Sequence, residues 1–158
     1  MEQKHFQTWA DVAPRLVAVA AGREPADLII RNGRWVNVHT REVLANHDIA
    51  VAEGRIAYVG PDARHCEGAD TEIVEANGRY MVPGLCDGHM HIESGMLTPA
   101  EFARAVIGHG TTTMFTDPHE IANVLGLEGV RMMHDEALIQ PINIFTQMPS
   151  CAPSAPGL

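Results

Sequence analysis

The chain has few of the features that mark nucleic-acid-binding, membrane or secreted proteins. Its 158 residues include only 11 lysines and arginines against 20 acidic residues, which gives a formal net charge of -9. An acidic chain without a basic cluster is a poor partner for nucleic acid or an anionic membrane surface. No apolar run approaches the roughly 20 residues of a membrane-spanning helix. Residues 1–5 lack the basic and apolar regions of a signal peptide.

Cysteine is also scarce, and the three that occur are widely separated. They are Cys66, Cys86 and Cys151, an odd number at spacings that do not suggest a disulfide framework. Reduced thiols are typical of the cytoplasm, which is therefore the expected location.

The first 82 residues are predicted to form a helix and a small β-domain. Residues 8–21 have an amphipathic helical pattern, with Thr8 as N-cap, so a helical segment is expected over residues 1–24. Over residues 25–82 strand-like runs flank three turn signals, at 32–33, 53–54 and 77–78. Such signals favour hairpins, so three successive hairpins and a small antiparallel β-domain are expected.

From Pro83 the pattern changes to alternating strands and helices. Strands are expected at 85–91, 111–116 and 141–147, with helices at 98–109 and 120–137 between them. Thr98 and Glu101 are placed as the two ends of a capping box. Alternation of this kind predicts an α/β fold with a parallel sheet. Residues 83–158 are thus expected to be the first strands and helices of a β/α barrel.

A complete barrel of this kind takes about 250 residues. The segment 148–158 is rich in proline and has no clear helix or strand pattern. We therefore expect the chain to be the N-terminal piece of a longer enzyme, and inactive alone.

The segment 83–91, PGLCDGHMH, is the most informative in the chain. His89 and His91 are one residue apart, so along a strand both imidazoles face the same side. Neutral imidazole is a common ligand for catalytic divalent metals, and a barrel keeps its chemistry at the C-terminal ends of its strands. Asp87 lies on the same face and is expected to orient an imidazole N–H or to brace the strand.

Acidic and hydroxyl side chains follow both predicted strand ends. Glu93 completes an H-x-E pattern, which is half of the nucleobase-deaminase zinc signature, but the P-C-x-x-C half is absent. Glu93 could touch substrate, or could equally cap a helix or lie at the surface. Asp117, His119 and Glu120 end the second strand, where at least one site residue is expected. Asp117 could instead cap the following helix, and Glu120 could suit its positive end.

On these residues the chain resembles the amidohydrolase superfamily and, within it, the bacterial adenine deaminase family. Residues 82–91 are similar to the first barrel strand of that superfamily, and residues 25–82 to its small β-sandwich. The finer marks are HIES at 91–94, GTTT at 110–113, DPHEIANV at 117–124 and MPSC at 148–151. Gly95 departs from the H-I-E-S-S pattern common in the family.

The resemblance implies metal-dependent hydrolytic deamination of adenine to hypoxanthine and ammonia, a step of purine salvage. It implies one or two divalent ions, Mn or Fe first and Zn as the alternative, and a homo-oligomer at full length. The implied metal ligands are His89, His91 and His119, with Glu93 and Glu120 catalytic. Asp87, Ser94 and Asp117 would contact the substrate or orient the other groups.

Two other interpretations remain open at this point. The chain could belong to another amidohydrolase, such as a cyclic amidase or an amino-sugar deacetylase, since these share H-x-H. It could also be a non-catalytic truncated fragment or an interaction module, because an open parallel sheet exposes an unpaired edge. A substrate panel separates the first alternative from adenine deamination.

Overall fold

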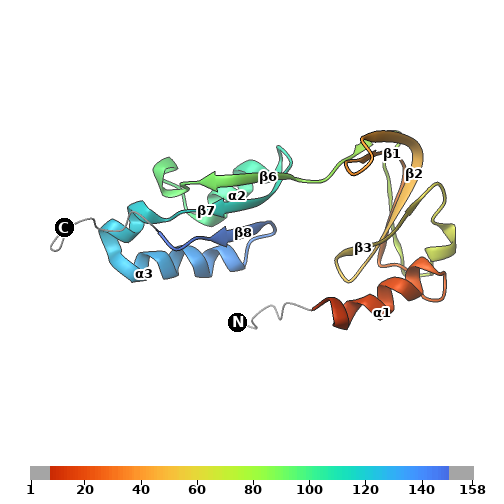
Figure 1. Cartoon of the computed structure of the whole chain (residues 1–158), viewed down its shortest axis with the longest axis horizontal. Helices are drawn as coiled ribbons and strands as arrows, with labels where there is room; N and C mark the ends of the chain where they lie inside the picture. Colours follow the sequence, from red (N-terminus) through yellow and green to blue (C-terminus); the bar gives the residue numbers. More distant parts are fainter. Residues whose placement is uncertain (1–7, 150–158) are drawn as a thin grey trace. The chain divides into compact units, whose positions relative to one another are not determined.

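The structure, a computed structural model, describes residues 8–149 and has the predicted α/β class (Figure 1). The chain divides into two compact units, Met1–Pro83 and Gly84–Leu158. None of the helices in the described range is both long and apolar enough to cross a membrane. Ser150 and Cys151 of the MPSC run lie outside the described residues, as does most of the segment 148–158.

The first unit is a helix packed on a five-stranded sheet. Its elements are α1 (Trp9–Ala20), β1 (Leu28–Asn37), β2 (Glu42–Ala52), β3 (Arg55–Gly60), the 3₁₀ turn η1 (Arg64–Cys66), β4 (Glu72–Glu75) and β5 (Tyr80–Met81). The strand order is β3-β2-β1-β4, and β5 also pairs with β1. Val12, Leu16 and Val19 of α1 share one buried cluster with Ile29 and Ala50 of the sheet. The hydrophobic stripe of α1 is therefore what joins it to the strands.

Local signals predicted α1 well. The helix begins directly after Thr8, as expected, and ends one residue before the predicted boundary at Ala21. The Asp11 carboxylate accepts hydrogen bonds from the Thr8 backbone N–H at 2.8 Å and from the Thr8 hydroxyl at 2.7 Å. These bonds lower the pKa of Asp11 below its usual value.

The predicted hairpin at Asn32–Gly33 is wrong. Instead β1 runs through this dipeptide, with an irregular register between Ile30 and Gly33, and the chain reverses only after Asn37. Asn32 has a φ of 54°, in the left-handed region. Asn-Gly accommodates that conformation in a β-bulge as readily as in a turn, so the dipeptide alone does not distinguish the two. The hairpin at Glu53–Gly54 is confirmed, since β2 and β3 are antiparallel neighbours.

The third predicted hairpin is also wrong. The chain does turn at Asn77–Gly78, where both residues have positive φ. However, β4 and β5 do not flank that turn as partners, because each pairs in parallel with β1. The Gly78 backbone N–H donates to the Asn32 carbonyl at 2.7 Å, which ties the turn to the bulge in β1. The sheet is consequently mixed rather than purely antiparallel.

The ion pair between Arg15 and Asp27 predicts an acid-sensitive contribution to the stability of this unit. The hydrogen bonds that the Arg15 guanidinium donates to the Asp27 carboxylate lower the pKa of Asp27 below 3.8. The stabilisation is therefore present above pH about 4 and is lost as pH falls through the lower pKa of the folded state. Because the pair is partly exposed, Asp27→Asn should lower the unfolding free energy at pH 7 by only about 0.2–1 kcal/mol.

The difference between Asp27→Asn and the parent should shrink steadily below pH 4. Trp9 and Trp35 are the two tryptophans of the chain and both lie in this unit, so denaturant titrations followed by tryptophan fluorescence report on it alone. Asp70→Asn, at an exposed position, is the matched control. A difference that persists unchanged at pH 2 would contradict the assignment.

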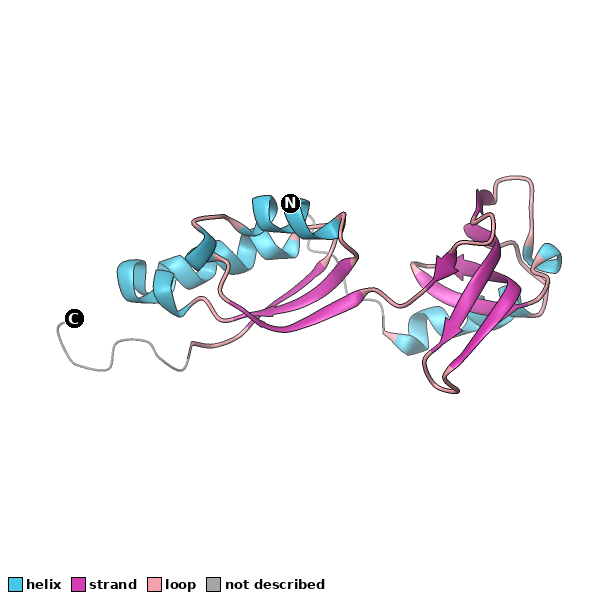
Figure 2. Cartoon of the chain, turned by 90° about the horizontal axis from the view of Figure 1, so that it is seen from above, coloured by secondary structure: helices cyan, strands magenta, loops and turns pink. Residues whose placement is uncertain are grey.

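The second unit is the predicted three-stranded parallel sheet with two helices. Its elements are β6 (Leu85–Met90), the 3₁₀ turn η2 (Glu93–Gly95), α2 (Pro99–Ile107), β7 (Thr111–Thr116), α3 (His119–Leu138) and β8 (Asn143–Thr146). The order β6-β7-β8, parallel throughout, is confirmed. Figure 2 shows both helices over one face of this sheet. Met114 and Ile144 face them within a buried cluster that includes Ala103 and Met133.

The ends of the two helices differ in part from the prediction. The predicted capping box of α2 is wrong, because the Thr98 side chain makes no cap hydrogen bond and Glu101 instead pairs with Arg104. The predicted helix at 120–137 is interrupted in α3 at Gly126, whose φ of 61° and ψ of -147° are not helical. Gly129 is buried within the helix and does not break it. The first residues of α3, His119 and Glu120, follow closely on the C-terminal end of β7.

Candidate active site

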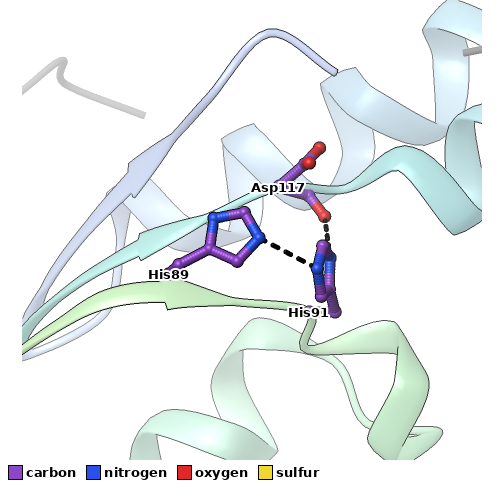
Figure 3. A group of neighbouring side chains, drawn as sticks. All are labelled: His89, His91 and Asp117. Atoms are coloured by element: carbon purple, nitrogen blue, oxygen red, sulfur yellow. Dashed lines mark hydrogen bonds between the residues drawn. The ribbon is translucent and has the colours of Figure 1, made fainter. Parts of the chain in front are cut away.

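The predicted site residues converge at the C-terminal ends of β6 and β7 (Figure 3). His89 lies on β6 and His91 directly after it, while Asp117 directly follows β7. The Asp117 backbone N–H donates to the Met90 carbonyl at 2.9 Å, which extends the pairing of the two strands to the site itself. Because the strands are parallel, their carboxyl ends meet at one edge, as in barrel enzymes.

The two histidines present their Nε2 atoms to each other. Their Nε2 atoms are 3.0 Å apart, and the rings are nearly perpendicular. His91 Nδ1 lies 2.9 Å from the Asp117 carbonyl oxygen. Since a carbonyl oxygen only accepts, Nδ1 must carry the proton, and the lone pair of neutral His91 is then on Nε2. This backbone contact orients His91 as a metal ligand would need to be oriented.

Asp117 is a buried carboxylate with an unused oxygen. Its residue is only 8% exposed, and Oδ1 has no hydrogen-bond partner within residues 8–149. His119 Nδ1 is also buried, makes no hydrogen bond to the described part of the chain and lies 3.6 Å from Asp117 Oδ2. The His119 ring also meets the His91 ring edge to face at 4.6 Å. Buried polar atoms are rarely left unpaired in native proteins, so this group of atoms fits a site that holds a cation.

The donor atoms suit a divalent cation. One ligand atom from each of His89, His91 and Asp117 lies within 4.8 Å of the others. Two imidazole nitrogens with one carboxylate oxygen are typical ligands of Zn²⁺, Mn²⁺ and Fe²⁺. His119, predicted as a ligand, lies beside this group but is not one of its three members. The third member is Asp117, which was predicted to orient other groups or contact substrate.

The predicted carboxylates beside the histidines also come together. The Glu120 backbone N–H donates to Glu93 Oε1 at 3.2 Å, and the Ser94 hydroxyl donates to Glu120 Oε1 at 2.5 Å. Asp87 braces the strand, since its Oδ1 accepts the His89 backbone N–H at 3.1 Å. Of its two predicted roles, the structure shows the brace, and the imidazole N–H of His91 is oriented by the Asp117 carbonyl instead.

Sequence reasoning did not single out Asp117 as a member of the ligand group. The clue to Asp117 in the sequence is its position. Asp117 is the first residue after β7, and β7 pairs with β6, the strand that leads to the two histidines. Alternate residues of a strand share a face. Met114 and Thr116 are fully buried on one face, so Phe115 and the next alternate position, Asp117, lie on the opposite face. The pattern could therefore have placed Asp117 beside the histidines, once the pairing of β6 with β7 was assumed.

The sequence matches known proteins over its whole length. Residues 80–156 match the sequence profile of the amidohydrolase family. An adenine deaminase from Ruegeria pomeroyi is 84% identical over 158 residues, which are 100% of this chain and 26% of that protein. An adenine deaminase from another Ruegeria species is 78% identical over the same shares. The chain thus spans about a quarter of the length of these curated relatives.

A solved structure supports the fold assignment. A mutant of atrazine chlorohydrolase from Arthrobacter aurescens, crystallised with zinc and atraton, matches with a TM-score of 0.61 and 18% identity. The match covers 77% of this chain and 35% of that one, and at this identity it shows the fold alone. The profile match over residues 80–156, together with the two relatives that match the chain along its length, assigns the parallel β/α unit with its paired histidines to the amidohydrolase family.

Proposed function

We propose that this chain supplies the His89, His91 and Asp117 part of a metal site in an enzyme that hydrolyses adenine to hypoxanthine and ammonia. The observation that carries the proposal is the convergence of these ligand atoms within 4.8 Å. It occurs in a chain 84% identical to an adenine deaminase. The family resemblance further favours a cytoplasmic enzyme that acts on a small purine and assembles as a homo-oligomer.

Two imidazole nitrogens and one carboxylate oxygen would hold a divalent cation. The family resemblance favours Mn²⁺ or Fe²⁺, with Zn²⁺ as the alternative. A second ion would use His119, whose buried Nδ1 makes no hydrogen bond within residues 8–149 and lies 3.6 Å from Asp117 Oδ2.

The residues around the proposed metal ligands have separate roles in the reaction. A bound divalent cation would lower the pKa of a water molecule toward neutrality. One of the two neighbouring carboxylates, Glu120 or Glu93, would carry the proton that passes from water to the departing amino group. Ser94 holds one oxygen of Glu120, and Asp87 keeps the backbone of His89 in place. Adenine and water then give hypoxanthine and ammonia without a redox change.

The test uses a fusion in which this chain replaces the equivalent 158 residues of the Ruegeria pomeroyi adenine deaminase. Loaded with Mn²⁺, the fusion should release ammonia from adenine. It should act on neither a cyclic amide such as dihydroorotate nor an N-acetylated amino sugar. The 158-residue chain assayed alone should be inactive, because it spans only about a quarter of the length of the adenine deaminases that it matches. A folded, metal-loaded fusion that left adenine unchanged would refute the proposal.

A further inference from the structure

Two consecutive residues after β6 hold one residue at the start of α3. Glu93 Oε1 accepts the backbone N–H of Glu120, and the Ser94 hydroxyl donates to the Glu120 carboxylate. We propose that Glu93 and Ser94 form a two-point clamp that positions the Glu120 carboxylate, and that Glu93 itself carries no proton. This inference rests on the proposed function, since it narrows proton transfer to Glu120.

The first point of the clamp is a helix cap supplied from another element. Helix α3 begins after Pro118, whose side chain has no polar atom. The N–H groups in the first turn of a helix have no partner within the helix and are usually satisfied by an N-cap side chain. Glu93, from η2, provides that acceptor for Glu120. A carboxylate at this end also suits the positive end of the helix dipole.

The second point of the clamp acts on the side chain. Ser94 and Glu120 are both partly open to solvent, and a glutamate in such a place normally samples several rotamers. The hydrogen bond of 2.5 Å from the Ser94 hydroxyl to Oε1 fixes one end of the carboxylate. Oε2 of Glu120 is then the oxygen left to exchange a proton with water or substrate. Glu93 thus holds the backbone of Glu120, and Ser94 holds its side chain.

The surroundings of Glu93 argue against a proton-carrying role. Its Oε1 is engaged by the Glu120 N–H. Its Oε2 is buried and has no hydrogen-bond partner among the described residues. With one oxygen bound to the Glu120 N–H and the other buried, the Glu93 carboxylate is placed to hold the start of α3. Glu93 is therefore a positioning residue, and it links the loop that follows His91 to the helix that begins at His119.

A positioning role and a proton-carrying role of Glu93 predict different effects of the Glu93→Gln substitution. In Glu93→Gln the side-chain carbonyl remains as acceptor for the Glu120 N–H, and the amide NH₂ replaces an oxygen that has no partner to lose. In the fusion described above, Glu93→Gln should keep kcat for adenine within about fivefold of the parent. Glu93→Ala should lower kcat about 100-fold with little change in KM, because the misplaced Glu120 remains accessible but badly oriented.

Ser94 provides a second, independent pair of variants. Ser94→Ala should lower kcat about tenfold, and Ser94→Thr should restore most of it because it keeps the hydroxyl. Glu128→Gln is the matched control, at an exposed position of α3 where Glu128 pairs with Arg131, and it should leave kcat unchanged. If Glu93→Gln were as inactive as Glu93→Ala, Glu93 would be a proton carrier and the inference would be overturned.

Hydrogen exchange tests the clamp on Glu120 even if the fusion does not act on adenine. In the 158-residue chain, hydrogen exchange of the Glu120 amide, followed by NMR, should accelerate about fivefold or more in Glu93→Ala. It should change little in Glu93→Gln and Glu128→Gln. Unchanged exchange in Glu93→Ala would overturn the clamp. Loss of adenine deamination by the parent fusion, with the exchange pattern intact, would refute the proposed function alone.

Discussion

Replacing both His89 and His91 with asparagine should lower kcat/KM for adenine in the fusion by about a thousandfold or more. The expectation follows from the contact of their Nε2 atoms, 3.0 Å apart, which would be two ligands of the same ion. A metal ion that activates water contributes several kcal/mol to catalysis, and each 1.36 kcal/mol corresponds to a factor of about ten. Asparagine keeps a polar side chain but removes both imidazole nitrogens.

Metal content separates this explanation from a general loss of structure. The purified double variant should bind substoichiometric Mn²⁺ while its circular dichroism remains that of the parent. His134→Asn is the matched control because His134 is exposed on α3, away from the site, and it should keep both metal and activity. Retention of full metal content by the double variant would mean that the ion is held elsewhere.

The strand and helix pattern of the second unit could be predicted because its signals are local. The Pro83–Gly84 break, the alternation of residues in β7 and the run of periodic residues in α3 each lie within one segment. Parallel pairing then follows from the alternation of element types. His89 and His91 could be placed as a pair for the same reason, since two residues on one strand share a face whatever the rest of the fold does.

The first unit shows where local reasoning fails. Asn32–Gly33 and Asn77–Gly78 both favour left-handed backbone, and the structure uses that preference in both places. What the dipeptides do not encode is which strands lie on either side. That choice depends on pairing of β1 with β4 and β5, which are distant in sequence and are selected by packing rather than by the turn.

The same distinction applies to the candidate site. Its histidines are adjacent in sequence, but Asp117 reaches them only through the pairing of β6 with β7. Glu93 and Glu120 are 27 residues apart and meet through a hydrogen bond that no motif indicates. The sequence alone left a capping role and a substrate role for Glu93 equally open, and the contact with the Glu120 N–H favours the capping role.

Asp117→Asn should separate metal binding from folding because the two are expected to change in opposite directions. In the metal-free chain Asp117 is a buried carboxylate whose Oδ1 has no partner in the described structure. A buried carboxylate with one oxygen that lacks a hydrogen bond is costly, even with His119 Nδ1 3.6 Å from the other oxygen. The neutral, similarly shaped asparagine should therefore leave the thermal unfolding midpoint unchanged or raise it. The same change removes a charged ligand and should weaken Mn²⁺ binding by at least about tenfold.

Both effects can be measured on the 158-residue chain. Calorimetric titration with Mn²⁺ gives the affinity, and scanning calorimetry with and without the ion gives the midpoints. Because a ligand stabilises the form that binds it, added Mn²⁺ should raise the midpoint of the parent more than that of Asp117→Asn. Asp135→Asn, at an exposed position of α3, should match the parent in both measurements. A variant with unchanged affinity and a lowered midpoint would show that Asp117 is a structural acceptor, and the unused oxygen would then need another partner.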